Sequence, residues 1–295
     1  MTRNPPEGAS SGPTPGTQRR RGGRWRRRRG APGGLGLVLT AALAALLLVE
    51  PARLSQAIAQ MPLLQDDRFA GLQWTFVRIR YYAFTVDSRY RVDYWGEPWA
   101  IDGPAAEQNL SRRLRTATAM EVNDPVVLTL DDPKLWDQGW IYMVEPGNLR
   151  LRDNEVSILR EFLLRGGTLT FDDFHGPYEW DNAAKEMKRV FPDREFVDLE
   201  PPHPIFSSFY NIAQYPQVAG LGSFFAGRSW EKGGFVARLR AIVDDQGRPM
   251  VLANWNTDMG DGVEWSNAEE YPGYIKYTAD SYRMFINEII YSLTH

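Results

Sequence analysis

Short, continuous apolar runs alternate with one amphipathic segment in the middle of the chain. The runs are residues 126–130 (VVLTL) and 140–144 (WIYMV), a pattern typical of strands that are covered on both faces. Residues 154–165 place apolar side chains on one helical face, and Gly166 and Gly167 then end the helix and turn the chain directly into the strand TLTF. Strands that alternate with helices predict a parallel sheet with helices on both faces.

The remaining segments fit the same architecture. Further strands are expected at residues 76–84, 195–199, 237–244 and 249–255, and further helices at residues 105–118, 182–190 and 282–293. The turn DQGRP between the last two strands suits a hairpin. We therefore predict an α/β fold, a three-layer sandwich with a mainly parallel central sheet. Because 43% of the 295 residues are hydrophobic, one domain from about residue 72 to residue 295 can bury a substantial core.

The first 59 residues have a different character. Residues 1–30 are rich in Pro, Gly, Ser and Arg, and we expect them to be a disordered arm. Residues 35–49 (LGLVLTAALAALLLV) are an uninterrupted apolar run, and an A-x-A site ends at Ala59. A basic segment, a short apolar run and such a site predict a signal peptide at residues 31–59; left uncleaved, the run is expected to form an N-terminal hydrophobic helix that anchors the chain in the membrane. In both cases the rest of the chain is expected outside the cytoplasm, in the periplasm.

Charge and cysteine content exclude several classes of function. Residues 1–30 hold nine Arg and one Glu, which leaves 25 basic against 36 acidic residues in the remainder. Such an acidic body argues against a nucleic-acid partner, because Lys and Arg hold phosphate backbones; the arginine arm would bind nucleic acid or anionic lipid only if it survived in the mature protein. The absence of cysteine excludes disulfides, thiolate zinc sites and a cysteine nucleophile. Any metal must therefore use His, Asp, Glu or carbonyl ligands.

The segment GGTLTFDDFHG carries the principal catalytic candidates. Asp172, Asp173 and His175 follow the TLTF strand, where ligands bind in doubly wound sheets. Two carboxylates beside an imidazole suit acid/base chemistry or a divalent metal; alternatively, the aspartates cap the next turn and the histidine packs against an aromatic neighbour. His203, in EPPHPIF, is the fourth candidate, expected at the same rim, and its alternative is a packing histidine in a turn.

Ligand-binding candidates come from a second polar segment and from one aromatic residue. Asn256, Asp258 and Asp261 lie in NWNTDMGDGVEW, which follows an expected strand and offers several oxygens, although its spacing is not that of an EF-hand. An Asp- and Gly-rich turn is the alternative. Tyr178 belongs to a set of aromatic residues that would line a carbohydrate or peptide groove, or would simply be buried. No cofactor is assigned, and a divalent metal remains compatible with these residues.

Several separated blocks resemble one known family. The stretches DPKLWDQGWIYMVEPGNLRLRDNEVSILREFLLRGGTLTFDDFHG, FPDREFVDLEPPHPIF and NWNTDMGDGVEW resemble the family called domain of unknown function 4159, from about Phe76 to the C-terminus. The resemblance implies a bacterial, cell-envelope domain with a glutamine-amidotransferase-like or flavodoxin-like fold. It implies no amidotransferase activity here, because the chain lacks the cysteine nucleophile. The glycine-pair strand also resembles that of cysteine-free, trehalose-utilisation-like proteins, which implies sugar-related ligands.

Two functions remain open from the sequence. The first is a noncatalytic envelope module whose polar Asp/His rim binds an envelope protein or a small polar ligand. The second is a hydrolase-like enzyme, metal-assisted or acid/base, acting on a carbohydrate-related substrate through the four candidates Asp172, Asp173, His175 and His203. The two hypotheses share one expectation, that these side chains converge at one edge of the sheet.

Overall fold

The computed structural model describes residues 67–83 and 97–295, all of which belong to one compact unit, residues 63–295. The arm expected at residues 1–30 and the signal peptide or anchor expected at residues 31–59 lie outside the described residues. None of the helices in the described part of the chain combines the length and the apolar character needed to cross a membrane.

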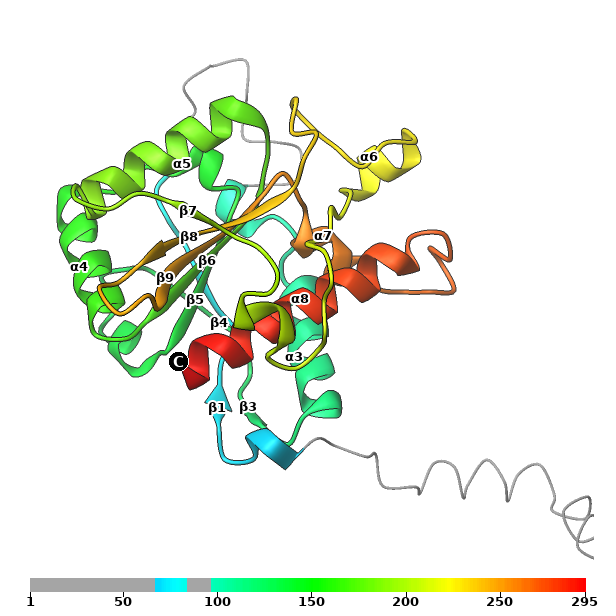
Figure 1. Cartoon of the computed structure of the whole chain (residues 1–295), viewed down its shortest axis with the longest axis horizontal. Helices are drawn as coiled ribbons and strands as arrows, with labels where there is room; N and C mark the ends of the chain where they lie inside the picture. The colour runs from blue at the N-terminus through cyan, green and yellow to red at the C-terminus, as the bar shows by residue number, and fades with distance from the viewer. Residues whose placement is uncertain (1–66, 84–96) are drawn as a thin grey trace, which may run out of the picture. The chain divides into compact units, whose positions relative to one another are not determined.

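A seven-stranded sheet forms the centre of the domain (Figure 1). Its strands, in spatial order, are β4 (Val126–Leu128), β2 (Val77–Ile79), β5 (Trp140–Val144), β6 (Thr168–Phe174), β9 (Pro249–Trp255), β8 (Arg238–Val243) and β7 (Val197–Leu199). The first five are mutually parallel, whereas β8 runs antiparallel to both of its neighbours. The expected α/β class and mainly parallel sheet are therefore confirmed. A separate parallel pair consists of β1 (Gln73–Trp74) and β3 (Glu121–Val122).

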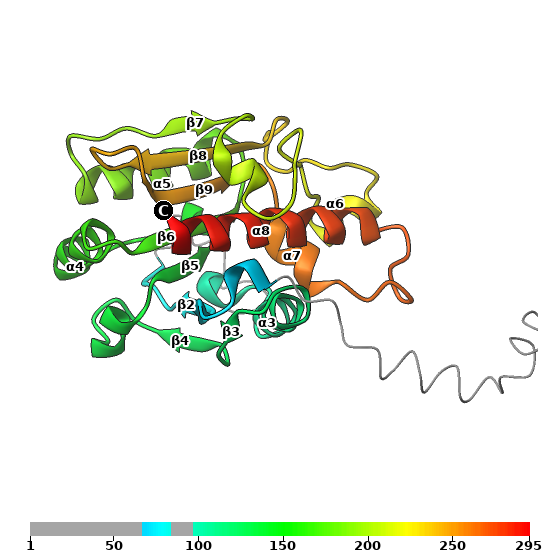
Figure 2. The ribbon, with the colours of Figure 1, turned by 60° about the horizontal axis from the view of Figure 1, so that its bottom comes forward.

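Helices cover both faces of the sheet, as the two views show (Figures 1 and 2). On one face, α3 (Ala105–Ala117) and α8 (Ile275–Thr294) pack against side chains such as Trp140 and Tyr142. On the other face, α4 (Asp153–Leu164) and α5 (Gly176–Val190) pack against the alternate residues of the same strands. Because both faces of β5 are buried, all five of its residues are apolar in character, which explains the continuous run in the sequence.

Short elements complete the fold. They are the 3-10 turns η1 (Asp67–Phe69), η2 (Pro98–Ala100), η3 (Pro133–Asp137), η4 (Pro146–Asn148) and η5 (Pro204–Ser207), and the helices α6 (Leu221–Phe225) and α7 (Met259–Glu264). Several bounds differ from expectation, such as those of β2, which is shorter than residues 76–84, and of α8, which begins before residue 282. Three differences bear on the site. β6 continues through the aspartate doublet to Phe174, α5 begins directly after His175, and the segment expected as a polar loop contains α7.

The strand order defines where a ligand would be expected. Numbered along the chain, the five parallel strands β4, β2, β5, β6 and β9 occur in the spatial order 2-1-3-4-5. The chain therefore passes from β2 outward to β4 and then back across β2 to β5, so the strand order reverses between β2 and β5. In such sheets, ligands bind beyond the carboxyl ends of the strands near this reversal. The ends of β5, β6 and β9 share this edge, which we call the carboxyl edge.

Candidate functional site

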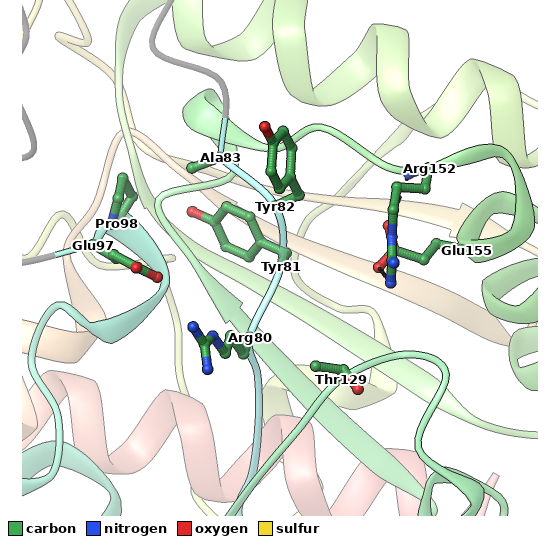
Figure 3. A pocket seen from close by; sticks show the side chains of 9 residues that line it. All are labelled: Arg80, Tyr81, Tyr82, Ala83, Glu97, Pro98, Thr129, Arg152 and Glu155. Carbon is green, nitrogen blue, oxygen red and sulfur yellow. Dashed lines mark hydrogen bonds and ion pairs between the residues drawn. The ribbon is translucent and has the colours of Figure 1, made fainter.

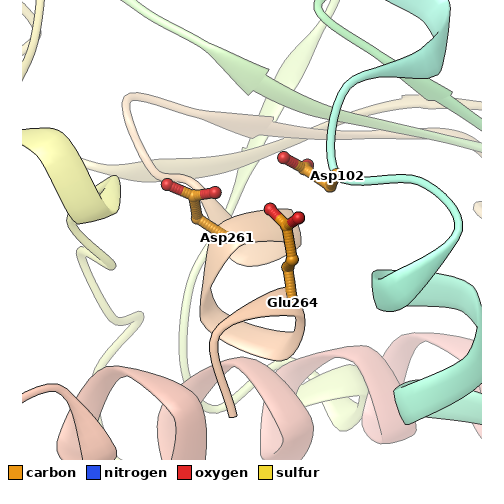
Figure 4. Close-up of side chains that lie close together, drawn as sticks. All are labelled: Asp102, Asp261 and Glu264. Carbon is orange, nitrogen blue, oxygen red and sulfur yellow. The ribbon is translucent and has the colours of Figure 1, made fainter. Parts of the chain in front are cut away.

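Five carboxylates from separate parts of the chain gather at the carboxyl edge. Asp102 precedes α3, Asp173 lies in β6, Asp258 follows β9, and Asp261 and Glu264 lie in α7. They form two sets of three, Asp102 with Asp173 and Asp258, and Asp102 with Asp261 and Glu264. Within each set the potential ligand oxygens all lie within 4.8 Å of one another. Figure 4 shows the carboxylates of the second set facing a common space.

Asp102 is held at this edge by its backbone. Its φ of 65° lies in the left-handed region, which Asp tolerates better than most residues, and its carbonyl accepts the N–H of Ala106 at the start of α3. The side chain is buried, and its Oδ2 has no hydrogen-bond partner among the described residues. Gly260 permits this position, because a Cβ there would lie 2.0 Å from Asp102 Oδ2. A glycine of α7 therefore makes room for the carboxylate.

Asp173 and His175 form a buried pair at the end of β6. Asp173 also has a left-handed φ, 53°, and the register between β6 and β9 shifts at this point. The His175 Nε2 atom lies 3.1 Å from Asp173 Oδ1, while Nδ1 has no partner in the described structure. The imidazole is only 1% exposed, and the backbone N–H of His175 donates to Glu179 Oε2 over 2.6 Å. The histidine can therefore orient the Asp173 carboxylate.

Asp258 and Asp261 are tied to the short helix that follows β9. Asp258 caps α7, because its Oδ1 accepts the backbone N–H of Asp261 over 2.8 Å. Asp261 Oδ2 accepts the N–H of Leu221 over 2.6 Å, and its Oδ1 accepts the indole N–H of Trp265 over 2.9 Å. Asp258 and Asp261, two of the residues predicted to bind a ligand, thus lie at the carboxyl edge. Asp258 belongs to the set of three in which every residue is buried.

Asp172, unlike Asp173, uses its carboxylate for hydrogen bonds to Tyr142 and to the backbone of α7. It is fully buried, and its Oδ2 accepts the Tyr142 hydroxyl over 3.0 Å and the backbone N–H of Gly260 over 2.7 Å. Its Oδ1 accepts the N–H of Met259 over 3.3 Å. Burial, followed by the charge of Asp173, raises the pKa of Asp172 well above its usual range. Asp172 therefore fastens the first turn of α7 to the sheet and is a positioning residue.

Asn256 and Tyr178 complete the set predicted to bind a ligand. Asn256 is buried with a φ of 63°, its Oδ1 accepts the N–H of Gly176 over 2.8 Å, and its Nδ2 donates to the Val236 carbonyl over 2.7 Å. Its amide thus joins the start of α5 to the segment before β8. Tyr178 lies in the first turn of α5 and is 68% exposed, so its ring is available to a partner.

His203 lies elsewhere, contrary to the expectation that it reaches the same rim. Its Nδ1 accepts the N–H of Ile205 at the start of η5, and its ring centroid lies 5.5 Å from that of Tyr291 near the end of α8. The acidic cluster lies near the other end of α8, where Tyr274 is close to Asp258 and Asp261. Tyr274 and Tyr291 are 17 residues apart, which corresponds to about 25 Å along a helix. Burial and the nearby His295 lower the pKa of His203. The packing alternative describes its position.

The carboxylates perturb one another because basic partners are scarce. Burial, and then the charges of Asp261 and Asp173, raise the pKa of Asp102 well above its usual range. Burial and repulsion from neighbouring carboxylates also raise the pKa of Asp258 and that of Asp261. The same two causes raise the pKa of Glu264 to about 7. Within residues 67–83 and 97–295, none of the five forms an ion pair with a lysine or arginine.

The charges of Arg78 and Lys232 act on the cluster, but each of these cations forms its ion pair with a glutamate outside it. Arg78 in β2 is buried, forms an ion pair with Glu107, and donates from Nη1 to the Ile101 carbonyl over 2.9 Å. Lys232 pairs with Glu179 over 2.7 Å. Burial alone would lower the pKa of Lys232, but surrounding carboxylates outweigh it and raise that pKa. Neither of these two side chains therefore forms an ion pair with one of the five carboxylates.

Backbone strain is concentrated at the same edge. Among the described residues other than glycine, those with a left-handed φ are Asp102, Glu145, Asp173, Lys232 and Asn256. Glu145 directly follows β5 and donates its N–H to the Asp172 carbonyl, so it lies beside the doublet. Such conformations cost about 1–3 kcal/mol each and gather at functional sites, where the surrounding structure imposes them.

Sequence reasoning missed Asp102, Glu264 and Arg78. The Asp-Gly-Pro sequence directly before the α3 helix was the available signal for Asp102, because this order favours a tight turn that presents the aspartate. Glu264 lies in a helix with two glycines and no apolar period. Arg78 lies in an alternating stretch that predicts a strand, and this pattern contains no signal for its place beside the cluster.

A cavity of about 520 Å³ lies beside the ends of β2 and β4 (Figure 3). Arg80, Tyr81, Tyr82, Ala83, Glu97, Pro98, Thr129, Arg152 and Glu155 line it. The Tyr81 hydroxyl donates to the Glu145 carbonyl over 2.8 Å, which connects this wall to the carboxyl edge.

Comparisons with known proteins address the family. A search of curated proteins finds no match. The family model described as domain of unknown function (DUF4159) matches residues 88–293, which include α3, β6, β9, α7 and all five carboxylates of the cluster. Because this match covers more than half of the chain, the protein belongs to the DUF4159 family.

Proposed function

We propose that the domain binds a divalent cation through Asp102, Asp173 and Asp258, and that the bound cation presents the carboxyl edge to a small polar ligand or a protein partner. One observation carries this proposal. Three buried carboxylates, contributed by segments more than 70 residues apart, bring ligand oxygens to within 4.8 Å of one another. Ligands around one cation at metal–oxygen distances of roughly 2.0–2.6 Å lie this close together.

The donor set favours a hard cation. All three side chains offer carboxylate oxygens, which suit Mg²⁺, Ca²⁺ or Mn²⁺, whereas softer metals favour thiolate or imidazole ligands. His175 fits this set as an orienting group, because a histidine within hydrogen-bond distance of a metal-binding carboxylate fixes its rotamer.

Electrostatics supports the same reading. Burying an ionised carboxylate is costly unless a cation or hydrogen bonds compensate. The raised pKa values of Asp102 and Asp258 reflect that cost in the protein alone. A divalent cation would favour their ionised forms and offset it, so binding would also stabilise the fold.

The fold is compatible with a flavodoxin-like assignment. The spatial order 2-1-3-4-5 of the parallel strands is the flavodoxin-like order, with β7 and β8 added antiparallel at one edge. We propose this superfamily on strand order. The chain lacks the cysteine on which an amidotransferase would rely.

Metal-assisted hydrolysis is the second candidate, and His175 is the observation that favours it. Its Nδ1 is buried without a described partner, and its Nε2 lies beside Asp173. Asp172 and His203, the other residues predicted for this chemistry, serve α7 and η5 instead. A hydrolase would therefore use Asp173, His175 and the bound cation, and a carbohydrate-related substrate remains the prediction. Sustained release of product from a glycoside panel by wild type but not by Asp173→Asn would establish it.

We also propose that the domain acts outside the cytoplasm. The support is the basic segment, apolar run and A-x-A site within residues 1–59. N-terminal sequencing of the exported form tests it: a start at Gln60 indicates a cleaved signal, and retention of residues 35–49 in a membrane fraction indicates an anchor. Recovery of the full chain in the cytosol would contradict both.

Metal analysis of the purified full chain tests the binding function. The chain is stripped with a chelator, dialysed against Mn²⁺ and analysed for bound metal. Wild type is expected to retain Mn²⁺, and Asp173→Asn to lose the ion held by Asp102, Asp173 and Asp258. Asp193→Asn is the matched control, because Asp193 is an exposed aspartate in the turn after α5, a 15-residue helix that begins at the carboxyl edge and extends about 22 Å. Equal metal content in wild type and Asp173→Asn would refute the proposal.

A further inference from the structure

We infer that the carboxyl edge holds two divalent cations, bridged by the Asp102 carboxylate. The first is the cation proposed above, on which this inference rests, and the second would bind Asp102, Asp261 and Glu264. The two sets of carboxylates share Asp102 and no other residue. Asp102 would thus be a ligand to both cations, while each of the other four would serve one.

The division of the cluster favours two cations over one. All ligands of a single cation lie within about twice the metal–oxygen distance of one another, at most about 5 Å. Among the described residues the five carboxylates meet this limit only as two overlapping sets of three. A single cation therefore cannot contact all five without rearrangement, whereas two cations sharing Asp102 can. Carboxylate-bridged cations in two-metal sites lie about 3.5–4 Å apart.

The Oδ2 oxygen of Asp102 is unpartnered among the described residues, and the carboxylate is directed into the cluster. It is 7% exposed, yet its Oδ2 accepts no hydrogen bond from the described residues. Figure 4 shows it facing Asp261 and Glu264. Oδ2 lies close to Gly260 of α7 and is buried, so it is not turned toward solvent. An orphaned, buried carboxylate oxygen calls for a cationic partner.

The carboxylates of the second set can still bind a cation. Asp261 uses each oxygen for one hydrogen bond, to Leu221 and Trp265, and a carboxylate oxygen has a second lone pair. Asp261 and Glu264 are both partly exposed, unlike the three members of the first set. The second position therefore lies nearer to solvent, where a cation exchanges readily and a small anion has access.

Stoichiometry of Mn²⁺ binding to the full chain tests the bridge. Metal-free wild type, Glu264→Gln, Asp173→Asn, Asp102→Asn and the control Asp193→Asn are titrated with Mn²⁺ while free Mn²⁺ is followed by electron paramagnetic resonance. Wild type and the control are expected to bind two ions, Glu264→Gln and Asp173→Asn one each, and Asp102→Asn to lose both high-affinity sites. Loaded wild type should also show spin coupling between its two ions, which both single-ion variants should lack.

The outcomes separate this inference from the proposed function. One ion in wild type, with Glu264→Gln unaffected, overturns the second position and leaves the first intact. No bound ion in wild type overturns both. Two ions without spin coupling, or loss of only one in Asp102→Asn, overturns the bridge. Circular dichroism of each metal-free variant confirms folding, and amide substitution is expected to preserve it because it removes like-charge repulsion.

Discussion

Replacing Gly260 with alanine would move the Asp102 carboxylate without removing any ligand. The new Cβ would lie 2.0 Å from Asp102 Oδ2 and 3.1 Å from the Tyr142 hydroxyl, and such carbon contacts are essentially never closer than 3.0 Å. Because Gly260 also donates to the buried Asp172, the helix cannot retreat freely, and the carboxylate must shift by about 1 Å. Metal–ligand distances tolerate only about 0.2 Å. We expect Mn²⁺ affinity to fall roughly 10–100-fold or more, as when a ligand loses its orienting contact.

A matched glycine in α6 provides the control. A Cβ at Gly222 would meet nothing within 4 Å, so Gly222→Ala adds the same methyl group without a clash and should slightly favour the helix. Isothermal titration of the full-length variants with Mn²⁺ measures both affinities. Overpacking at Gly260 should also lower the free energy of unfolding by about 1–3 kcal/mol. If Gly260→Ala binds Mn²⁺ as tightly as Gly222→Ala, Asp102 is not a ligand and the reasoning fails.

Three further results are expected. Since the pKa of Glu264 rises from 4.5 to about 7 on folding, the free energy of unfolding of the metal-free protein should decrease as pH rises across this interval; urea titrations should show a weaker decrease in Glu264→Gln. Asp172→Ala leaves the Tyr142 hydroxyl and the Gly260 N–H buried without an acceptor, so unfolding monitored by tryptophan fluorescence should cost about 2–4 kcal/mol less. His203→Ala should leave Mn²⁺ affinity unchanged in calorimetry, because the ring packs on Tyr291 away from the cluster; a changed affinity would reinstate His203 at the site.

The core elements were predictable because their sequences carry the relevant periods. β5 coincides with the apolar run at residues 140–144, and β9 with the strand expected at 249–255. The α4 helix ends at Leu164, where Arg165 and the glycine pair follow. In contrast, α7 has two glycines and no apolar period. It forms because Asp258 caps it and Asp172 accepts its first N–H groups, and these are tertiary contacts that a local pattern does not contain.

The candidate site was predictable only where its residues follow strands. Asp173 and Asp258 come at the ends of β6 and β9, and the ends of parallel strands share an edge. Asp102 follows no described strand directly, and its position depends on a left-handed backbone and on the close approach of Gly260. His203 follows β7, but the next residues, Ile205 and Phe206, enter the core against α8 and take the chain away from the edge.

Thermal unfolding of the full chain with and without Mn²⁺ tests the central claim most directly, with wild type compared to Asp258→Asn. Asparagine also caps helices well, so this variant should keep α7 while removing one ligand charge. The account predicts that Mn²⁺ raises the midpoint of wild type, by about 2.7 kcal/mol of added stability per site at 100 times the dissociation constant, and raises that of Asp258→Asn less, because this variant lacks one ligand of the first cation. Without metal, the variant should unfold at a higher temperature than wild type, because the buried repulsion is reduced. Equal rises in the two proteins, or no rise in wild type, would contradict a cation site built from Asp102, Asp173 and Asp258.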